Sequence, residues 1–203
     1  YDGEWKDDKK NGHGTYTWAH GAKYEGGFKD NEIAGHGVLT LDDGSPYEGD
    51  WVEGKYYLGT KNSNGQPHGH GIGIRIRQPN AYDGILSLQW YKGEWKDGEK
   101  NGEGIEKCGN GHQYNGNWTN GKKHGRGLFK WADTSEYNGE WMNNNMNGPG
   151  VKTYVDGSRY VGQWTNGQRH GMGTCLWGEA SKWPGDRYEG VWKDDDMTSE
   201  GMY

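Results

Sequence analysis

The stretch from Tyr91 to Gly104 reads YKGEWKDGEKNGEG, and the same plan returns from Tyr160 to Gly173 as YVGQWTNGQRHGMG. Each stretch places Tyr, Gly and Trp at alternate positions, crosses a short polar turn, and ends on glycines separated by one residue. Alternation with a period of two predicts a β-strand on each side of the turn. One such unit is therefore expected to be a β-hairpin that carries rings and glycines on one face.

The opening motif, Tyr-x-Gly-x-Trp or Phe, occurs eight times along the chain. The interval is 23 residues, except for 44 residues between the third and fourth copies and 28 residues before the last copy. A fixed period of this size indicates a repeat array. We interpret residues 1–203 as one array with an enlarged third repeat at 47–90 and a partial last repeat. The repeats start at Tyr1, Tyr24, Tyr47, Tyr91, Tyr114, Tyr137, Tyr160 and Tyr188.

The composition favours an array whose core is built from rings. Only 30% of the residues are hydrophobic, yet the chain holds 12 Trp, 14 Tyr and 39 Gly. The net charge of -6 argues against a nucleic-acid partner, because phosphate binding relies on a basic face. Neither an apolar run long enough to span a membrane nor a secretory signal is evident, so we expect a cytoplasmic protein. The chain opens on a repeat Tyr and stops within the eighth repeat, so we also expect it to be a segment of a longer protein.

The hairpin turns have a recurrent residue type, seven positions after each repeat Tyr. It is always Asp, Asn or Gly, the residues that most readily adopt a positive φ. The pairing that we expect sets Gly3 opposite Gly14 and Trp5 opposite Gly12, and between hairpins Gly14 opposite Phe28. Rings would then lie over bare glycine backbone, which compensates for the glycines. The turn residues are Asp8, Asn31, Gly54, Gly98, Gly121, Asn144, Gly167 and Asp195.

Stacking the repeats turns equivalent positions into columns, and two columns of rings would line a groove along the array. Tyr and Trp are favoured at interfaces, because a rigid ring offers a large contact area with little loss of entropy. We expect the Trp side chains to be mostly core and some Tyr side chains to be exposed. The predicted partner-binding groove consists of Tyr91, Trp95, Tyr114, Trp118, Trp131, Tyr137, Trp141, Tyr154, Tyr160, Trp164 and Trp177.

These motifs closely resemble MORN (membrane occupation and recognition nexus) repeats, and the resemblance covers nearly the whole chain. It implies an all-β fold, an elongated and twisted single-layer antiparallel sheet of consecutive hairpins. It also implies a scaffold in a cytoskeletal, ciliary or membrane-proximal assembly. No catalytic residue carries over from the family, so we expect no enzymatic activity.

The array departs from its own pattern between Trp51 and Tyr91. Residues 56–67 are interpreted as a polar loop, followed by two lengthened strands that form an arm projecting from one edge, with its tip at 78–84. A partner contact and a tolerated insertion are both open, and a degenerate extra repeat from Tyr57 is a third alternative. The predicted contact arm consists of Ile72, Ile74, Arg75, Ile76, Arg77, Ile85, Leu86 and Leu88.

Several short motifs resemble ligand-binding or metal-binding motifs, but the repeat pattern itself accounts for them. The segment 116–123 resembles a phosphate loop but ends on Lys123 rather than on the Ser or Thr that holds magnesium. His68 and His70 share a strand face, but His or Asn recurs at the position of His68 in other repeats, which favours structural hydrogen bonding over a metal site. Cys108 and Cys175 lie in separate, non-adjacent repeats, too far apart for a disulfide, and are expected to be free. We therefore predict no metal, no cofactor and no catalytic residues.

Three kinds of interaction follow from the sequence. The leading prediction is a protein partner, an extended peptide or a helix, that docks along the aromatic groove. Anionic lipid headgroups are the alternative, bound by a basic fringe, and a regulatory or oligomerisation segment of a larger enzyme is another. Unpaired strand edges at the sheet ends would allow a homodimer. The basic fringe consists of Lys9, Lys10, Lys122, Lys123, Arg126 and Arg169.

Overall fold

The structure is a computed structural model that describes residues 1–77 and 86–202. Within these ranges the chain forms β-strands joined by turns, without a helix. The all-β prediction is confirmed. The strands are β1 (Asp2–Lys6), β2 (Lys9–Thr17), β3 (Lys23–Lys29), β4 (Glu32–Thr40), β5 (Pro46–Trp51), β6 (Lys55–Lys61), β7 (Pro67–Arg77), β8 (Ser87–Lys96), β9 (Glu99–Lys107), β10 (Gln113–Thr119), β11 (Lys122–Lys130), β12 (Glu136–Met142), β13 (Asn145–Thr153), β14 (Arg159–Thr165), β15 (Gln168–Leu176), β16 (Arg187–Lys193) and β17 (Asp196–Met202).

These strands form two open antiparallel sheets. One sheet has five strands in the order β1 to β5, and the other has twelve strands in the order β17 to β6. Our prediction of a single sheet is therefore wrong, because the array divides inside the enlarged third repeat, between β5 and β6. The chain correspondingly forms two compact units, Tyr1–Leu58 with Ile72–Trp90 and Gly59–Gly71 with Tyr91–Tyr203. We call them the first and second units.

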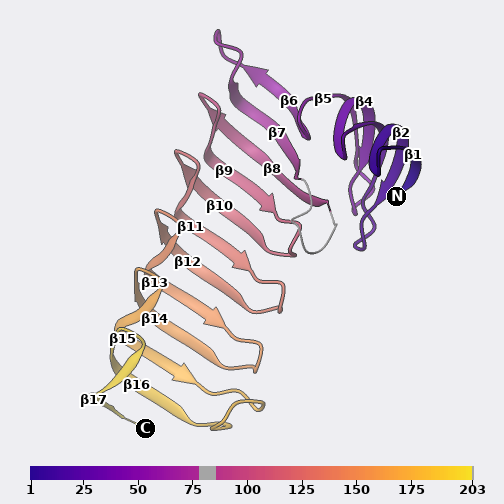
Figure 1. Ribbon diagram of the computed structural model, residues 1–203. Helices are drawn as coiled ribbons and strands as arrows, with labels where there is room; N and C mark the ends of the chain where they lie inside the picture. Colours follow the sequence, from indigo (N-terminus) through magenta and orange to yellow (C-terminus); the bar gives the residue numbers. More distant parts are fainter. Residues whose placement is uncertain (78–85, 203) are drawn as a thin grey trace. The chain divides into compact units, whose positions relative to one another are not determined.

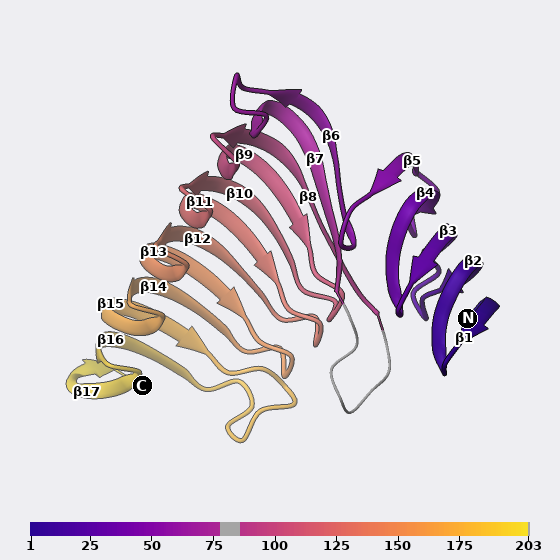
Figure 2. The ribbon, with the colours of Figure 1, turned by 45° about the horizontal axis from the view of Figure 1, so that its top comes forward.

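In the second unit the strands follow one another in chain order, each beside its sequence neighbours (Figure 1). The strands from β9 to β16 are bowed in the same sense (Figure 2). Each strand pairs with the next through a short connection, as expected for consecutive hairpins. The repeat of the sequence is therefore a repeat of the structure in this unit.

Each hairpin closes through a turn with two consecutive residues of positive φ. In the hairpin between β12 and β13 these are Asn143 at 50° and Asn144 at 73°. Positive φ at both central residues matches a type I′ turn, whose twist suits an antiparallel hairpin. All eight turn positions predicted from the sequence have a positive φ, which confirms them: Asp8, Asn31, Gly54, Gly98, Gly121, Asn144, Gly167 and Asp195.

The register within a hairpin is confirmed at the glycines and wrong at the tryptophans. Gly3 pairs with Gly14, but Trp5 pairs with Lys10 instead of Gly12, because a bulge lies between Gly3 and Trp5. Between these two pairs β2 has two more residues than β1, and Gly12, with a φ of 66°, lies within this stretch. The same shift recurs in other repeats and moves the side chain nine positions after each Tyr next to the Trp.

The register between hairpins also differs from the expected one. Gly14 pairs with Gly26, and Gly12 pairs with Phe28. Glycine therefore pairs with glycine on both sides of each strand, which produces a continuous row of glycines across the second sheet. This row includes Gly104, Gly116, Gly127, Gly139, Gly150, Gly162, Gly173, Gly190 and Gly201.

The enlarged third repeat does not project as an arm. The apolar side chains of its two lengthened strands are 1–5% exposed and belong to the core of the first unit, together with Trp18, Tyr24 and Leu39. The prediction of lengthened strands is confirmed by β7 and β8, whereas the predicted polar loop at 56–67 is wrong over its first part, which forms β6. Ile85 and the predicted tip at 78–84 lie outside the described residues. The buried side chains are Ile72, Ile74, Ile76, Leu86 and Leu88, whereas Arg75 and Arg77 are exposed.

The second unit has its own core, which consists almost entirely of rings. Its buried side chains include the repeat tyrosines from Tyr91 to Tyr188 and the repeat tryptophans Trp118, Trp141, Trp164 and Trp192. Cys175 is buried in the same core, and both Cys175 and Cys108 are free, as predicted.

Candidate functional site

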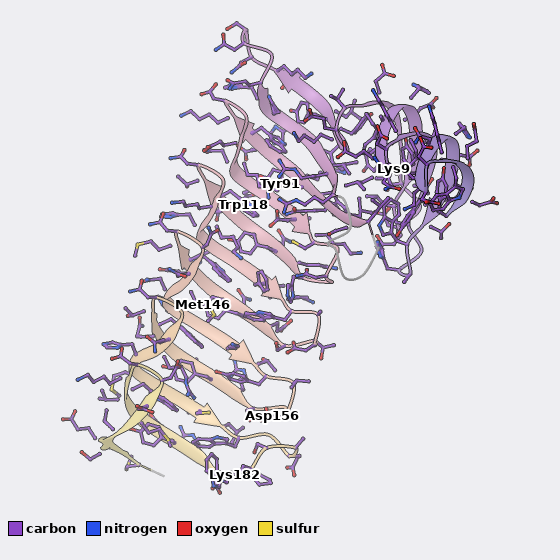
Figure 3. All side chains as sticks on the ribbon, viewed as in Figure 1. Lys9, Tyr91, Trp118, Met146, Asp156 and Lys182 are labelled. Atoms are coloured by element: carbon purple, nitrogen blue, oxygen red, sulfur yellow. The ribbon has the colours of Figure 1, made fainter. Side chains whose placement is uncertain are left out.

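The repeat Tyr and Trp side chains of the second unit form one continuous column of edge-to-face rings. The Tyr114 ring lies 5.0 Å from the Trp118 ring of its own repeat and 5.4 Å from the Trp141 ring of the next repeat, at interplanar angles of 89° and 83°. Edge-to-face geometry is the favoured arrangement of such pairs. Tyr91, Trp118 and Met146 follow one another along this unit in Figure 3. The column is therefore the hydrophobic core of a one-layer sheet.

The polar tips of these rings form hydrogen bonds to main-chain carbonyl oxygens, the Tyr hydroxyls within one repeat and the Trp indoles to the preceding repeat. The Tyr114 hydroxyl donates a hydrogen bond of 3.0 Å to the carbonyl oxygen of Asn117, and Trp141 Nε1 donates one of 3.1 Å to the carbonyl oxygen of Gly127. The pattern recurs in neighbouring repeats. Burial raises the pKa of the Tyr160 hydroxyl to about 12. These rings serve the fold and leave no free polar group for a partner.

The predicted groove residues consequently fall into two classes. Most of them are buried, with an exposed fraction of 5% or less, and are core side chains: Tyr91, Tyr114, Trp118, Tyr137, Trp141, Tyr160 and Trp164. The remaining four are half-buried and reach the surface: Trp95, Trp131, Tyr154 and Trp177.

Three of the half-buried rings follow strands β11, β13 and β15 at equivalent places in successive repeats. These are Trp131, Tyr154 and Trp177, and Phe129 lies beside them with its ring 4.7 Å from the Trp131 ring. Neither the Trp131 nor the Trp177 indole N–H has a hydrogen-bond partner in the described part of the chain. We call Phe129, Trp131, Tyr154 and Trp177 the outer rings.

Cations lie over both sets of rings. Lys123 Nζ is 4.3 Å from the Phe129 ring centroid and 4.8 Å from that of Trp141. Lys152 Nζ is 4.6 Å from the Trp131 centroid and 4.9 Å from that of Tyr154. Such distances are within the range of cation–π attraction. The surface therefore combines aromatic and positive character, and we call the outer rings with Lys123 and Lys152 the aromatic-cationic face.

The two lysines of this face differ from their neighbours because they form no direct ion pair with a described residue. Lys100 binds Glu106 directly, and Arg169 Nε lies 3.0 Å from Asp195 Oδ1. By contrast, among residues 1–77 and 86–202 no carboxylate oxygen lies within 4.0 Å of the Lys123 or the Lys152 nitrogen. Loss of hydration on burial lowers the pKa of both lysines below their ordinary value. More distant carboxylates still act on these cations, Glu106 on Lys123 and both Asp195 and Asp133 on Lys152, but neither lysine is held in a direct ion pair that would block a carboxylate of a partner.

Comparison with known protein families now gives the architecture a name. The MORN repeat profile matches residues 1–23, 24–45, 47–56, 63–72, 91–113, 114–136, 137–159 and 160–179, which is well over half of the chain. The chain belongs to the MORN repeat family. MORN repeats are binding modules for proteins and membranes and do not constitute an enzyme family. No curated protein matches the sequence.

The MORN profile treats the enlarged third repeat as two separate pieces, 47–56 and 63–72. These pieces correspond to the first and second halves of one repeat. The partial repeat from Tyr188 lies outside the matched segments, although β16 and β17 pair as the others do.

The predicted basic fringe is not one patch in this MORN array. Lys10 is only 8% exposed and packs over three rings, while Lys9 is 3.5 Å from Asp30. Lys122 is exposed and, because side chains alternate along a strand, lies on the sheet face opposite Lys123. The six basic residues therefore belong to several different environments.

The aromatic-cationic face contains residues that the sequence prediction did not select. Lys123 was assigned only to the basic fringe, and Phe129 and Lys152 were not assigned to a site. The repeat does carry a signal for them, because the side chains nine and fifteen positions after each Tyr share the face of the rings. The expected pairing hid this signal, since it left out the bulge that brings Lys123 opposite Trp118.

The described residues give little support for a metal site or for a membrane-spanning helix. Within it, no group of three His, Cys, Asp or Glu side chains is arranged to hold a metal ion. His68 is exposed, with Nδ1 3.4 Å from Asp97 Oδ1. No helix of the described residues is long and apolar enough to cross a membrane.

Proposed function

We propose that the second unit is a docking surface for a protein partner and that the chain acts as a non-enzymatic interaction scaffold. The observation that carries this proposal is the aromatic-cationic face. Phe129, Trp131, Tyr154 and Trp177 remain half-buried beside a column of repeat rings, from Tyr114 to Trp192, that is buried. Large rings that stay accessible on a rigid sheet are typical of interface positions.

An extended segment suits this face better than a globular surface. The outer rings follow successive strand pairs, so they form a narrow row that crosses the sheet. Two strand spacings separate neighbouring outer rings, about 10 Å. A partner segment that runs along this row would contact each ring in turn.

The setting that we propose is a cytoskeletal or ciliary assembly in the cytoplasm. Its support is the resemblance to MORN scaffolds, and localisation of a fluorescent fusion of the longer protein would test it. Dimerisation through a sheet edge stays a prediction, with β17 and β6 as the edge strands of the larger sheet. A monomer mass that does not change with concentration in light scattering would count against it.

Site-specific photo-crosslinking tests the docking face directly. A photoreactive amino acid replaces Tyr154 on the aromatic-cationic face or Val161, which is 39% exposed on the opposite face of the neighbouring strand. We expect crosslinked protein adducts from position 154 and few from position 161. Equal yields from the two positions would refute the proposed face.

The structure also determines which rings can be mutated in such work. Replacing Trp118, Tyr137 or Trp141 would remove core side chains, so a loss of binding could reflect unfolding. Trp131, Tyr154 and Trp177 are the appropriate targets, because half-buried rings cost less stability when they are shortened.

A further inference from the structure

The first unit covers its own aromatic face with two stretches of the chain, residues 72–76 of β7 and residues 86–88 at the start of β8, which we call the covering segment. Trp18 Nε1 donates a hydrogen bond of 2.6 Å to the carbonyl oxygen of Leu86, and the Leu86 N–H donates one of 3.1 Å to the Tyr16 hydroxyl. Both main-chain polar groups of Leu86 are thus satisfied by the polar tips of two rings. Ile72, Ile74 and Leu88 bury their side chains in the same core. This is a complete example of how a MORN face holds an extended chain.

The second unit carries the same positions, and none of its described residues forms a covering segment of this kind. Trp18 lies seventeen residues after its repeat Tyr, and Trp131, Tyr154 and Trp177 lie at the same offset in their repeats. Trp18 is 4% exposed and hydrogen-bonded, whereas Trp131 and Trp177 are half-buried and their indole N–H groups have no partner among the described residues. The one indole donor that holds main chain in the first unit thus has two counterparts in the second unit, neither of which has a partner among the described residues.

The side chains beside these positions vary from repeat to repeat, and the repeat of Trp18 itself carries Lys10 and Tyr16 at the offsets of nine and fifteen residues. In the next repeat, Ile33 and Leu39 occupy these offsets and are buried in the core that includes the aliphatic segment. In the second unit, Lys123 and Lys152 occupy these two offsets. An aliphatic face is covered by aliphatic side chains, so a cationic face calls for a segment with negative charge.

We propose that the aromatic-cationic face binds an extended acidic segment of a partner protein. In this arrangement Trp131 and Trp177 donate to main-chain carbonyl oxygens of the segment, as Trp18 does to Leu86, and Lys123 and Lys152 bind its carboxylates. The proposal rests on the docking function proposed above and defines the chemistry of the partner. Indole donors to main chain favour a peptide over a lipid headgroup, which offers phosphate but no such repeating carbonyls.

The repeat spacing sets the length of the segment. Trp131 and Trp177 follow β11 and β15, four strand spacings apart, which is about 19 Å. Extended chain rises about 3.3 Å per residue, so about six residues separate the two carbonyls that these indoles would hold. A peptide of about twelve residues would span both tryptophans and both lysines.

The experiment measures binding of labelled peptides to the whole chain by fluorescence anisotropy. One peptide of about twelve residues carries Glu at every third position between Thr and Val, and its counterpart carries Gln at those positions. We expect the Glu peptide to bind at least about tenfold more tightly, with the difference reduced by added salt. Equal affinities of the two peptides, or no binding of either, would overturn the proposal.

Single substitutions test whether the preference for the Glu peptide arises from the aromatic-cationic face. Lys123→Gln and Lys152→Gln should each weaken the Glu peptide about tenfold, since each removes one charge-assisted contact. Lys122→Gln, which removes the same charge from the other face of β11, should leave its affinity unchanged. Trp131→Phe keeps the ring but loses the N–H, so a weaker affinity is expected for both peptides. Near-UV circular dichroism confirms that each variant is folded.

Two further outcomes separate this inference from the docking function. If position 154 still crosslinks to protein while Glu and Gln peptides bind alike, the acidic partner is refuted and the docking face survives. Vesicles with anionic phospholipid are the second probe. If they bind the chain through Lys123 and Lys152 while the Glu peptide does not bind, a lipid partner replaces the protein partner and the proposal fails.

Discussion

The Tyr137 hydroxyl lies so close above Gly150 that a Cβ on this glycine would come within 2.3 Å of it. Tyr137 is fully buried, and its hydroxyl donates a hydrogen bond of 3.0 Å to the carbonyl oxygen of Glu140. The ring therefore cannot swing away at low cost. Equivalent contacts join Tyr91 to Gly104 and Tyr160 to Gly173. Glycine is required here because a ring occupies the volume of a side chain.

We expect Gly150→Ala to lower the free energy of unfolding by about 1–3 kcal/mol, the usual cost of forcing an extra methyl group into a packed core. Thermal unfolding followed by near-UV circular dichroism would measure it. Gly121→Asn is the matched control, because Gly121 is a turn residue with open space around it and Asn occupies the same position in Asn144. Similar destabilisation by both substitutions would show that the ring contact is not the cause.

The part of the fold that could be predicted is the part that local chemistry determines. The turns follow from residue types that accept positive φ, and the alternation of rings and glycines identifies the strands. The bulge could not be predicted from alternation, because two extra residues around Gly12 change the partner of Trp5 and leave the alternation of faces unchanged. The division into two sheets also escaped prediction, since it depends on where Ile72 and Leu86 find an apolar surface.

The site was predicted less well for a related reason. A column of rings in the sequence can be core or surface, and burial decides between them. The Tyr114 and Trp118 rings are sealed by the next repeat, whereas Trp131 lies near the strand end and stays accessible. Sequence periodicity identifies both columns of rings, but it does not show which column is buried and which is accessible.

Alkaline pH should unfold the array as its buried tyrosines ionise. The pKa of Tyr24 and of Tyr160 is raised by burial to about 12 from an ordinary value of 10.0. Their contribution to stability is complete below pH 10, where the unfolded state is also protonated, and is lost as the pH rises through 12. The lowered pKa of Lys123 acts in the opposite sense.

Absorbance at 295 nm, which reports tyrosinate, would follow this titration. We expect the signal of the buried tyrosines to appear near pH 12 together with the loss of near-UV circular dichroism. The tyrosines of a chain unfolded in urea, which titrate near pH 10, provide the reference. A native circular dichroism spectrum at a pH where all tyrosines have ionised would contradict the prediction.

The covering segment of the first unit should be essential to that unit. Ile74 is 3% exposed in its core, so Ile74→Ala leaves a cavity and should cost about 2–4 kcal/mol. Hydrogen exchange of amides in β2 to β4 would report the loss as faster exchange. Arg75→Ala changes the exposed neighbour on the same strand and should alter the exchange rates little. If Ile74→Ala leaves exchange in β2 to β4 unchanged, the segment does not hold this face.

Lys123 should be kept for binding at a cost in stability. Its nitrogen lies among the rings of Tyr114, Phe129 and Trp141, and loss of hydration is the largest influence that lowers its pKa. The next repeat shows that an apolar side chain fits this position, because Met146 occupies it and is 9% exposed. We therefore expect Lys123→Met to raise the free energy of unfolding by about 1 kcal/mol, since replacing a desolvated charge by a packed apolar group is often stabilising.

The same substitution should abolish the preference for the Glu peptide over the Gln peptide. Stability and binding would then change in opposite directions, as is common where a functional group is held in an unfavourable environment. Thermal unfolding and peptide anisotropy on the same sample would measure both effects, with Lys122→Met as the control on the opposite face. A Lys123→Met variant that is less stable than the original chain would show that cation–π attraction outweighs desolvation, and that Lys123 belongs to the core for structural reasons.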